Sequence, residues 1–163
     1  MTLANRITLS RIAFIPLCII FLLAGLYGLA TIIFLLLSFS DALDGYIARK
    51  HRHVSDLGKK LDPLADKILV TTVLIGLTGL GKAHPIAVMI ICARELLVAS
   101  FRNNRSFAAS PLAKWKTATQ VLAVVMLMLN IPFADGMLWI AVLLSLITGG
   151  AYLWRTDIFN QLK

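Results

Sequence analysis

Residues 41–67 read DALDGYIARKHRHVSDLGKKLDPLADK, and this stretch is the most informative part of the sequence about the fold. Asp41 and Asp44 are three residues apart, and Asp62 and Asp66 are four residues apart. Both spacings place a pair of carboxylates on one face of an α-helix. A short basic segment separates the two pairs. We therefore expect two successive helices that present their carboxylates to the same space.

The face that carries the first pair is also a face of small residues. Asp41, Asp44, Gly45 and Ala48 fall within a helical stripe about 100° wide. A ligand can approach the backbone there while carboxylates point at it. Each unpaired acid in a membrane helix costs on the order of 3 kcal/mol, so the four need bound cations, partner Lys or Arg side chains, or raised pKa values. Hard oxygen ligands suit Mg²⁺, Mn²⁺ or Ca²⁺, and two such ions can hold a pyrophosphate.

The composition of the chain indicates a membrane protein. Of the 163 residues, 59% are hydrophobic and 15% are charged, and the mean hydropathy is +0.85. A water-soluble domain is closer to half apolar and a quarter charged. The net charge of +8 favours cytoplasmic loops and anionic headgroups over nucleic acid in so apolar a chain. We expect one all-α domain, residues 1–163, with no nucleic-acid partner.

Six segments are long enough to cross about 30 Å of hydrocarbon. They are residues 7–24, 29–49, 62–80, 84–105, 113–130 and 137–154. The short connections at Gly25–Gly28, Gly79–Pro85 and Asn130–Gly136 hold a single Lys or Arg, Lys82, whereas the other two connections and both termini are rich in Lys and Arg. The positive-inside rule then predicts a polytopic protein with six transmembrane helices, and with both termini and the aspartates on the cytoplasmic side.

Simpler interpretations exist for the aspartates one at a time. Asp62 precedes Pro63, so it could cap a helix that starts there. Asp41 and Asp44 could pair with Arg49 or Lys50. A cation transporter could also use such acids, but it would place them near the membrane midplane and not at the cytoplasmic ends of helices. All four aspartates together favour a metal site.

The same stretch resembles the signature of the CDP-alcohol phosphotransferases. The pattern D-x2-D-G-x2-A-R-x8-G-x3-D-x3-D occurs without a mismatch. The resemblance implies a two-ion site of Mg²⁺ or Mn²⁺, with Asp66 as the general base, in a homodimeric enzyme. It also implies that Gly45, Ala48 and Gly58 shape the site for the CDP-alcohol and that Arg49 lies beside its phosphates. The implied ligands of the metal ions are Asp41, Asp44, Asp62 and Asp66.

Three further segments resemble the bacterial phosphatidylglycerophosphate synthase branch of that family. They are ANRITLSRI (residues 4–12), ARELLVASFRN (93–103) and AKWKTATQ (113–120). This branch implies CDP-diacylglycerol as donor, bound in part by Asn5 and Thr8, and glycerol 3-phosphate as acceptor, in the bacterial cytoplasmic membrane. Serine, an inositol phosphate or phosphatidylglycerol remain alternative acceptors, and an inactive homologue remains an alternative to an enzyme.

An acceptor that carries its own phosphate needs cations in addition to the metal ions. Arg94 is the most informative candidate, because it lies inside an apolar helix. Its alternative role is an ion pair with Glu95 or with an acid of another helix. The other basic residues could simply mark cytoplasmic loops. The full set of candidates for the acceptor phosphate is Arg11, Arg94, Arg102, Lys114 and Lys116.

Overall fold

A computed structural model describes the backbone of residues 3–51, 56–101 and 111–155, and the side chains of residues 10, 12–40, 67–99 and 115–151. Within these ranges the chain forms six α-helices and no strand, so the all-α prediction is confirmed there. The helices are α1 (Leu3–Leu23), α2 (Tyr27–His51), α3 (Asp56–Gly79), α4 (Pro85–Phe101), α5 (Pro111–Met128) and α6 (Ala134–Arg155).

Each predicted span corresponds to one of these helices, and the largest difference is in α3. This helix begins at Asp56, six residues before the predicted start, so Asp62 and Pro63 lie inside it. The interpretation of Asp62 as the cap of the helix is therefore wrong. Leucine and lysine are good helix formers, and Leu57, Lys59 and Lys60 extend the helix at the cost of one backbone hydrogen bond at Pro63.

The three predicted turns are confirmed, and all three close in the same way. Gly25, Gly81 and Asn130 each follow the last turn of a helix with a positive φ, of 77°, 69° and 51°. After α1, Gly25 N–H donates to Leu22 O at 3.1 Å and Leu26 N–H donates to Phe21 O at 3.0 Å. Equivalent pairs of bonds follow α3 and α5. This is the Schellman motif, in which glycine or asparagine ends a helix in the left-handed region.

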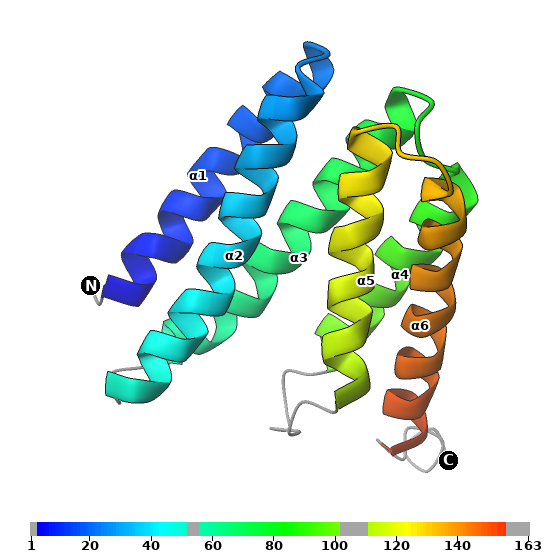
Figure 1. The fold of residues 1–163 in the computed structure, drawn as a ribbon. Helices are drawn as coiled ribbons and strands as arrows, with labels where there is room; N and C mark the ends of the chain where they lie inside the picture. The colour runs from blue at the N-terminus through cyan, green and yellow to red at the C-terminus, as the bar shows by residue number, and fades with distance from the viewer. Residues whose placement is uncertain (1–2, 52–55, 102–110, 156–163) are drawn as a thin grey trace.

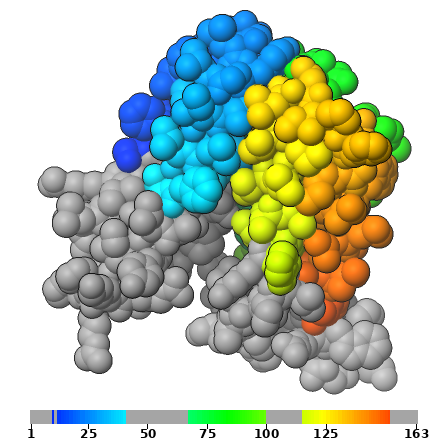
Figure 2. Space-filling model, in the orientation of Figure 1, coloured from blue at the N-terminus to red at the C-terminus, as the bar shows by residue number. Residues whose placement is uncertain are grey.

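The helices run alternately up and down, with α3 in the centre (Figure 1). α3 contacts α1, α2, α4 and α5, while α6 packs on α4 and α5. α2 and α5 lie side by side on one face (Figure 2). α2 ends and α3 begins at one end of the bundle, which we call the aspartate end. The first turn of α1 and the last turn of α6 lie there too (Figure 1). The three turns form the opposite, hairpin end.

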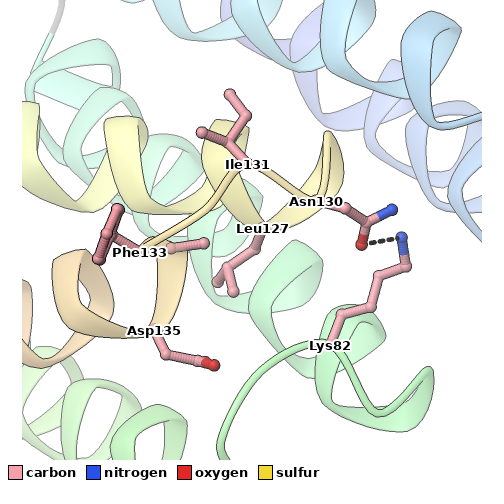
Figure 3. Close-up of a pocket in the computed structure, with 7 residues that line it drawn as sticks. Lys82, Leu127, Asn130, Ile131, Phe133 and Asp135 are labelled. Carbon is pink, nitrogen blue, oxygen red and sulfur yellow. Dashed lines mark hydrogen bonds between the residues drawn. The ribbon is translucent and has the colours of Figure 1, made fainter.

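Lys82 connects the three turns at the hairpin end. Its Nζ donates a hydrogen bond to Asn130 Oδ1 at 2.9 Å (Figure 3). The same Nζ lies 3.3 Å from the centre of the Tyr27 ring. A cavity of about 210 Å³ lies beside it, lined also by Leu127, Ile131, Phe133, Ala134 and Asp135. One ammonium therefore links the α1–α2, α3–α4 and α5–α6 hairpins, and these contacts explain the presence of a lysine in the short turns.

The bundle is apolar both inside and outside. Phe34, Leu69, Leu77 and Leu138 are buried in the core. Large apolar side chains are also exposed on all six helices; examples are Phe14, Leu36, Ile75, Leu96, Trp115 and Leu143. Within the described residues, one helical segment is long and apolar enough to cross a membrane, Ala134–Ala151, with mean hydropathy 1.6. Shorter apolar helical segments are Ile12–Leu23, Tyr27–Ser40, Lys67–Gly79 and Trp115–Met128.

Candidate active site

The backbone brings the two aspartate pairs to matching heights on neighbouring helices. Asp44 lies seven residues before the last residue of α2, and Asp62 lies six residues after the first residue of α3. Asp41 and Asp66 each lie ten residues from those same helix ends. At a rise of about 1.5 Å per residue, Asp44 and Asp62 lie about 10 Å from these two helix ends, and Asp41 and Asp66 lie about 15 Å from them. The four positions therefore form two levels.

This set of donors fits hard divalent cations. Four carboxylates on two contacting helices supply only oxygen ligands, which Mg²⁺ and Mn²⁺ prefer over the nitrogen and sulfur ligands of zinc. The aspartate side chains themselves lie outside the described side chains. Among the side chains that are described, no group of three or more His, Cys, Asp or Glu could hold a metal ion. The prediction that the aspartates bind metal stays a prediction.

The residues expected to bind the CDP-alcohol lie on three helices that contact one another. Asn5 and Thr8 are in α1, Gly45, Ala48 and Arg49 are in α2, and Gly58 is in α3. Their side chains lie outside the described set. α1 contacts both α2 and α3, and all six positions are near the aspartate end. The fold therefore places four of them on α2 and α3, the helices that carry the aspartates, and the other two on α1, which contacts both.

The candidates for the acceptor phosphate divide into two groups. Arg11 and Lys114 lie in α1 and α5 with side chains outside the described set, and Arg102 lies outside the described residues altogether. Arg94 and Lys116 are described, and they meet at a buried carboxylate, Glu95. Whether any of these residues binds phosphate stays a prediction, but the surroundings of Arg94 and Lys116 can be analysed in detail.

Glu95 contacts three cationic side chains, which lie on three different helices. Its Oε1 accepts hydrogen bonds from Arg94 Nη1 at 3.0 Å and from Lys116 Nζ. Its Oε2 lies 3.6 Å from Lys67 Nζ, which also donates to the backbone oxygen of Glu95 at 3.4 Å. Glu95 is 5% exposed and Lys116 is 7% exposed. We call Lys67, Arg94, Glu95 and Lys116 the Glu95 cluster; it has a formal charge of +2.

Arg94 is held on its other side by α6. Its Nε donates to Ser145 O at 3.0 Å, and its Nη2 donates to Thr148 Oγ1 at 2.9 Å. Gly149 makes this approach feasible, because a Cβ there would lie 3.0 Å from Arg94 Nε. The guanidinium therefore lies between α4 and α6. The expected alternative for Arg94, an ion pair with Glu95, is confirmed as a contact.

The sequence predicted Glu95 only as an ion-pair partner of Arg94, and it missed Lys67 and the role of Glu95 as the centre of a cluster, although a signal for that role was present. Glu95 is the only acidic residue between Asp66 and Asp135, in the middle of apolar helices. A lone carboxylate in such a position needs cationic partners. Nothing in the sequence indicated which lysine would reach it, because Lys67 and Lys116 are 28 and 21 residues away. Lys67 directly follows Asp66, so the cluster adjoins the α3 turn that carries the predicted base.

Further polar groups are buried among these helices. Gln120 lies one helical turn beyond Lys116, so both residues are on the same face of α5. Gln120 Nε2 and Ser145 Oγ are buried and have no hydrogen-bond partner in the part of the chain that the structure describes. Unpaired buried polar atoms are costly and are usually satisfied by a ligand or by ordered water. The region around the Glu95 cluster is therefore suited to a polar ligand.

Comparison with known proteins identifies relatives over most of the chain. A model of the CDP-alcohol phosphatidyltransferase family matches residues 1–147, which include all four aspartates and the Glu95 cluster. The chain is 37% identical to CDP-diacylglycerol–glycerol-3-phosphate 3-phosphatidyltransferase of Bacillus subtilis and 40% identical to that of Rickettsia bellii; each alignment covers 92% of both chains. It is 32% identical to a plant protein, CDP-diacylglycerol–glycerol-3-phosphate 3-phosphatidyltransferase 2 of Arabidopsis thaliana, over 94% of this chain and 80% of the relative.

Proposed function

This chain belongs to the CDP-alcohol phosphatidyltransferase family, and we propose that it transfers the phosphatidyl group of CDP-diacylglycerol to glycerol 3-phosphate. The products are phosphatidylglycerol phosphate and CMP. One observation carries this proposal: relatives at 37–40% identity over 92% of the chain are named for this reaction. The acceptor differs among alternatives within the family, so it is the part of the proposal that most needs an experiment.

In this proposal the enzyme is embedded in a membrane, and all six helices span the bilayer. The large apolar side chains exposed on every helix support it, since contact with lipid would remove them from water. The distribution of charge supports an orientation. The hairpin end holds Lys82 and Asp135, whereas Arg49, Lys50, Lys59 and Lys60 flank the α2–α3 connection. The positive-inside rule then places the aspartate end at the cytoplasmic face of a bacterial cytoplasmic membrane.

The four aspartates form the reaction centre in this proposal. Divalent cations bound by Asp41, Asp44, Asp62 and Asp66 would neutralise the pyrophosphate and make CMP a better leaving group. Asn5, Thr8, Gly45, Ala48, Arg49 and Gly58 bind the CDP-alcohol beside them. The acceptor hydroxyl oxygen attacks the phosphorus that carries the diacylglycerol, and the bond from that phosphorus to the oxygen of CMP breaks. Asp66 takes the proton of the hydroxyl.

The Glu95 cluster supports an acceptor with a phosphate of its own. Its net charge of +2 matches the charge of a phosphate dianion. Lys67, a member of the cluster, directly follows Asp66 in the sequence, so the cluster adjoins the proposed base. A guanidinium carries five N–H donors, of which the contacts of Arg94 with described residues use three. Lys116 uses one of its three donors on Glu95. Donors therefore remain for a phosphate at Arg94 and Lys116, with Arg11, Arg102 and Lys114 as further candidates.

The test supplies the purified protein with CDP-diacylglycerol, Mg²⁺ or Mn²⁺ and one acceptor at a time, and measures the release of CMP. Glycerol 3-phosphate should support turnover, and omission of the metal should stop it. Asp66→Asn should lower turnover by about 100-fold or more, the usual contribution of a general base. Release of CMP with serine or an inositol phosphate, but not with glycerol 3-phosphate, would overturn the assignment of the acceptor. An absence of metal-dependent release with every acceptor would overturn the enzymatic proposal.

A further inference from the structure

Glu95 has more cationic partners than charge neutrality requires. A buried carboxylate is balanced by one cation, yet Arg94, Lys116 and Lys67 all contact it. They come from α4, α5 and α3, so a single side chain links three helices at the aspartate end. Arg94 extends the link to α6 through Ser145 and Thr148. The carboxylate is therefore the centre of the contacts that determine where these cations lie.

Stability alone is a weak explanation for such a cluster. The desolvation of buried charges offsets most of their attraction, and apolar side chains of similar volume often stabilise a fold equally well. A ligand site has a different requirement. It needs cations that remain charged and fixed where the ligand binds, and a buried lysine does so only with an anionic partner. Lys116, at 7% exposure, depends on Glu95 in this way.

We propose that Glu95 is a positioning residue for the acceptor. Its carboxylate holds Lys116 and Arg94 so that their remaining N–H donors stay available to the phosphate of glycerol 3-phosphate. Through Lys67 it also fixes the turn of α3 that carries Asp66. This inference rests on the proposed function, since it assigns a role within the acceptor site. Glu95 itself makes no contact with the acceptor.

The effect of removing the charge distinguishes positioning from electrostatics alone. If Glu95 acted only by its charge, it would repel the acceptor phosphate, and Glu95→Gln would lower the KM for glycerol 3-phosphate. If Glu95 positions the cations, the same substitution leaves Lys116 buried without an anionic partner and removes one of the three contacts that hold Arg94. The KM for glycerol 3-phosphate then rises. The two explanations predict opposite signs for one measured quantity.

The experiment measures kcat and both KM values for the full chain in detergent micelles, together with its unfolding temperature. We expect Glu95→Gln to raise the KM for glycerol 3-phosphate by about tenfold or more, as for the loss of one partner of a buried charge pair. The KM for CDP-diacylglycerol should stay within about twofold, because none of the residues predicted to bind the CDP-alcohol belongs to the Glu95 cluster. Glu95→Asp keeps the charge on a shorter side chain, so its KM for the acceptor should lie between those of Glu95→Gln and the wild type.

Asp135→Asn is the matched control. It converts a carboxylate to an amide at the hairpin end, and it should change neither KM. An unchanged or lowered KM for glycerol 3-phosphate in Glu95→Gln would overturn the inference, as would equal changes in both KM values. If Glu95→Gln does not fold, the same criteria apply to Glu95→Asp. A wild-type protein inactive with glycerol 3-phosphate would refute the proposed function itself, which separates the two failures.

Discussion

Gly149 and Gly150 are adjacent in α6, yet the structure predicts opposite effects for the same substitution. An alanine Cβ at position 149 would lie 3.0 Å from Arg94 Nε and 3.1 Å from Arg94 Cγ. A Cβ at position 150 would meet nothing within 4 Å. Arg94 cannot move aside without loss, because Ser145, Thr148 and Glu95 hold its three nitrogens. The substitution Gly149→Ala must therefore disturb at least the bond from Nε to Ser145 O.

The magnitude follows from two opposing terms. Alanine in place of glycine inside a helix stabilises by about 0.5–1 kcal/mol. The loss of a hydrogen bond to a charged group costs about 1.5–3 kcal/mol. Gly149→Ala should therefore lower the free energy of unfolding by about 0.5–2.5 kcal/mol, while Gly150→Ala raises it by about 0.5–1 kcal/mol. The two variants should then differ by about 1.5–3 kcal/mol, which is the cost of the lost hydrogen bond.

Reversible unfolding in mixed micelles, followed by circular dichroism, measures this difference for both variants under identical conditions. Because the two substitutions are chemically the same and one residue apart, any general effect of alanine on α6 cancels in the comparison. Equal stability of the two variants, or a less stable Gly150→Ala, would refute the contact between Arg94 and α6. A second readout is the KM for glycerol 3-phosphate, which should rise in Gly149→Ala alone if Arg94 contacts the acceptor.

Two further substitutions test the core and the hairpin end. Phe34 in α2 is fully buried, so Phe34→Ala should lower the free energy of unfolding by about 3–5 kcal/mol, measured in the same unfolding assay. Phe39 in the same helix is 61% exposed and is the control; a loss as large for Phe39→Ala would contradict the assignment of the core. Lys82→Met removes the hydrogen bond to Asn130 and the contact with the Tyr27 ring, and it should cost about 1 kcal/mol or less while CMP release stays unchanged. A marked fall in CMP release would instead connect the hairpin end to the reaction.

Much of the fold could be predicted from local patterns. The apolar runs gave six helices with short turns, and glycine or asparagine marked each turn because those residues adopt a positive φ at low cost. The start of α3 could not be predicted in the same way. The Asp62–Pro63 pair resembles a helix start, but the helix formers before it extend α3 back to Asp56.

The sequence by itself determined the two aspartate pairs, because their spacing of three and four residues fixes one face of a helix wherever that helix lies. It also indicated that Arg94, a charged side chain in an apolar helix, must have a polar partner or a ligand. Only the tertiary structure decided which partners satisfy it. Glu95 contacts Lys67 on α3 and Lys116 on α5, which lie 28 and 21 residues away in the sequence. Gly149 leaves space for Arg94 beside α6. Such contacts depend on how helices pack, and packing brings together residues whose separation in the sequence carries no signal.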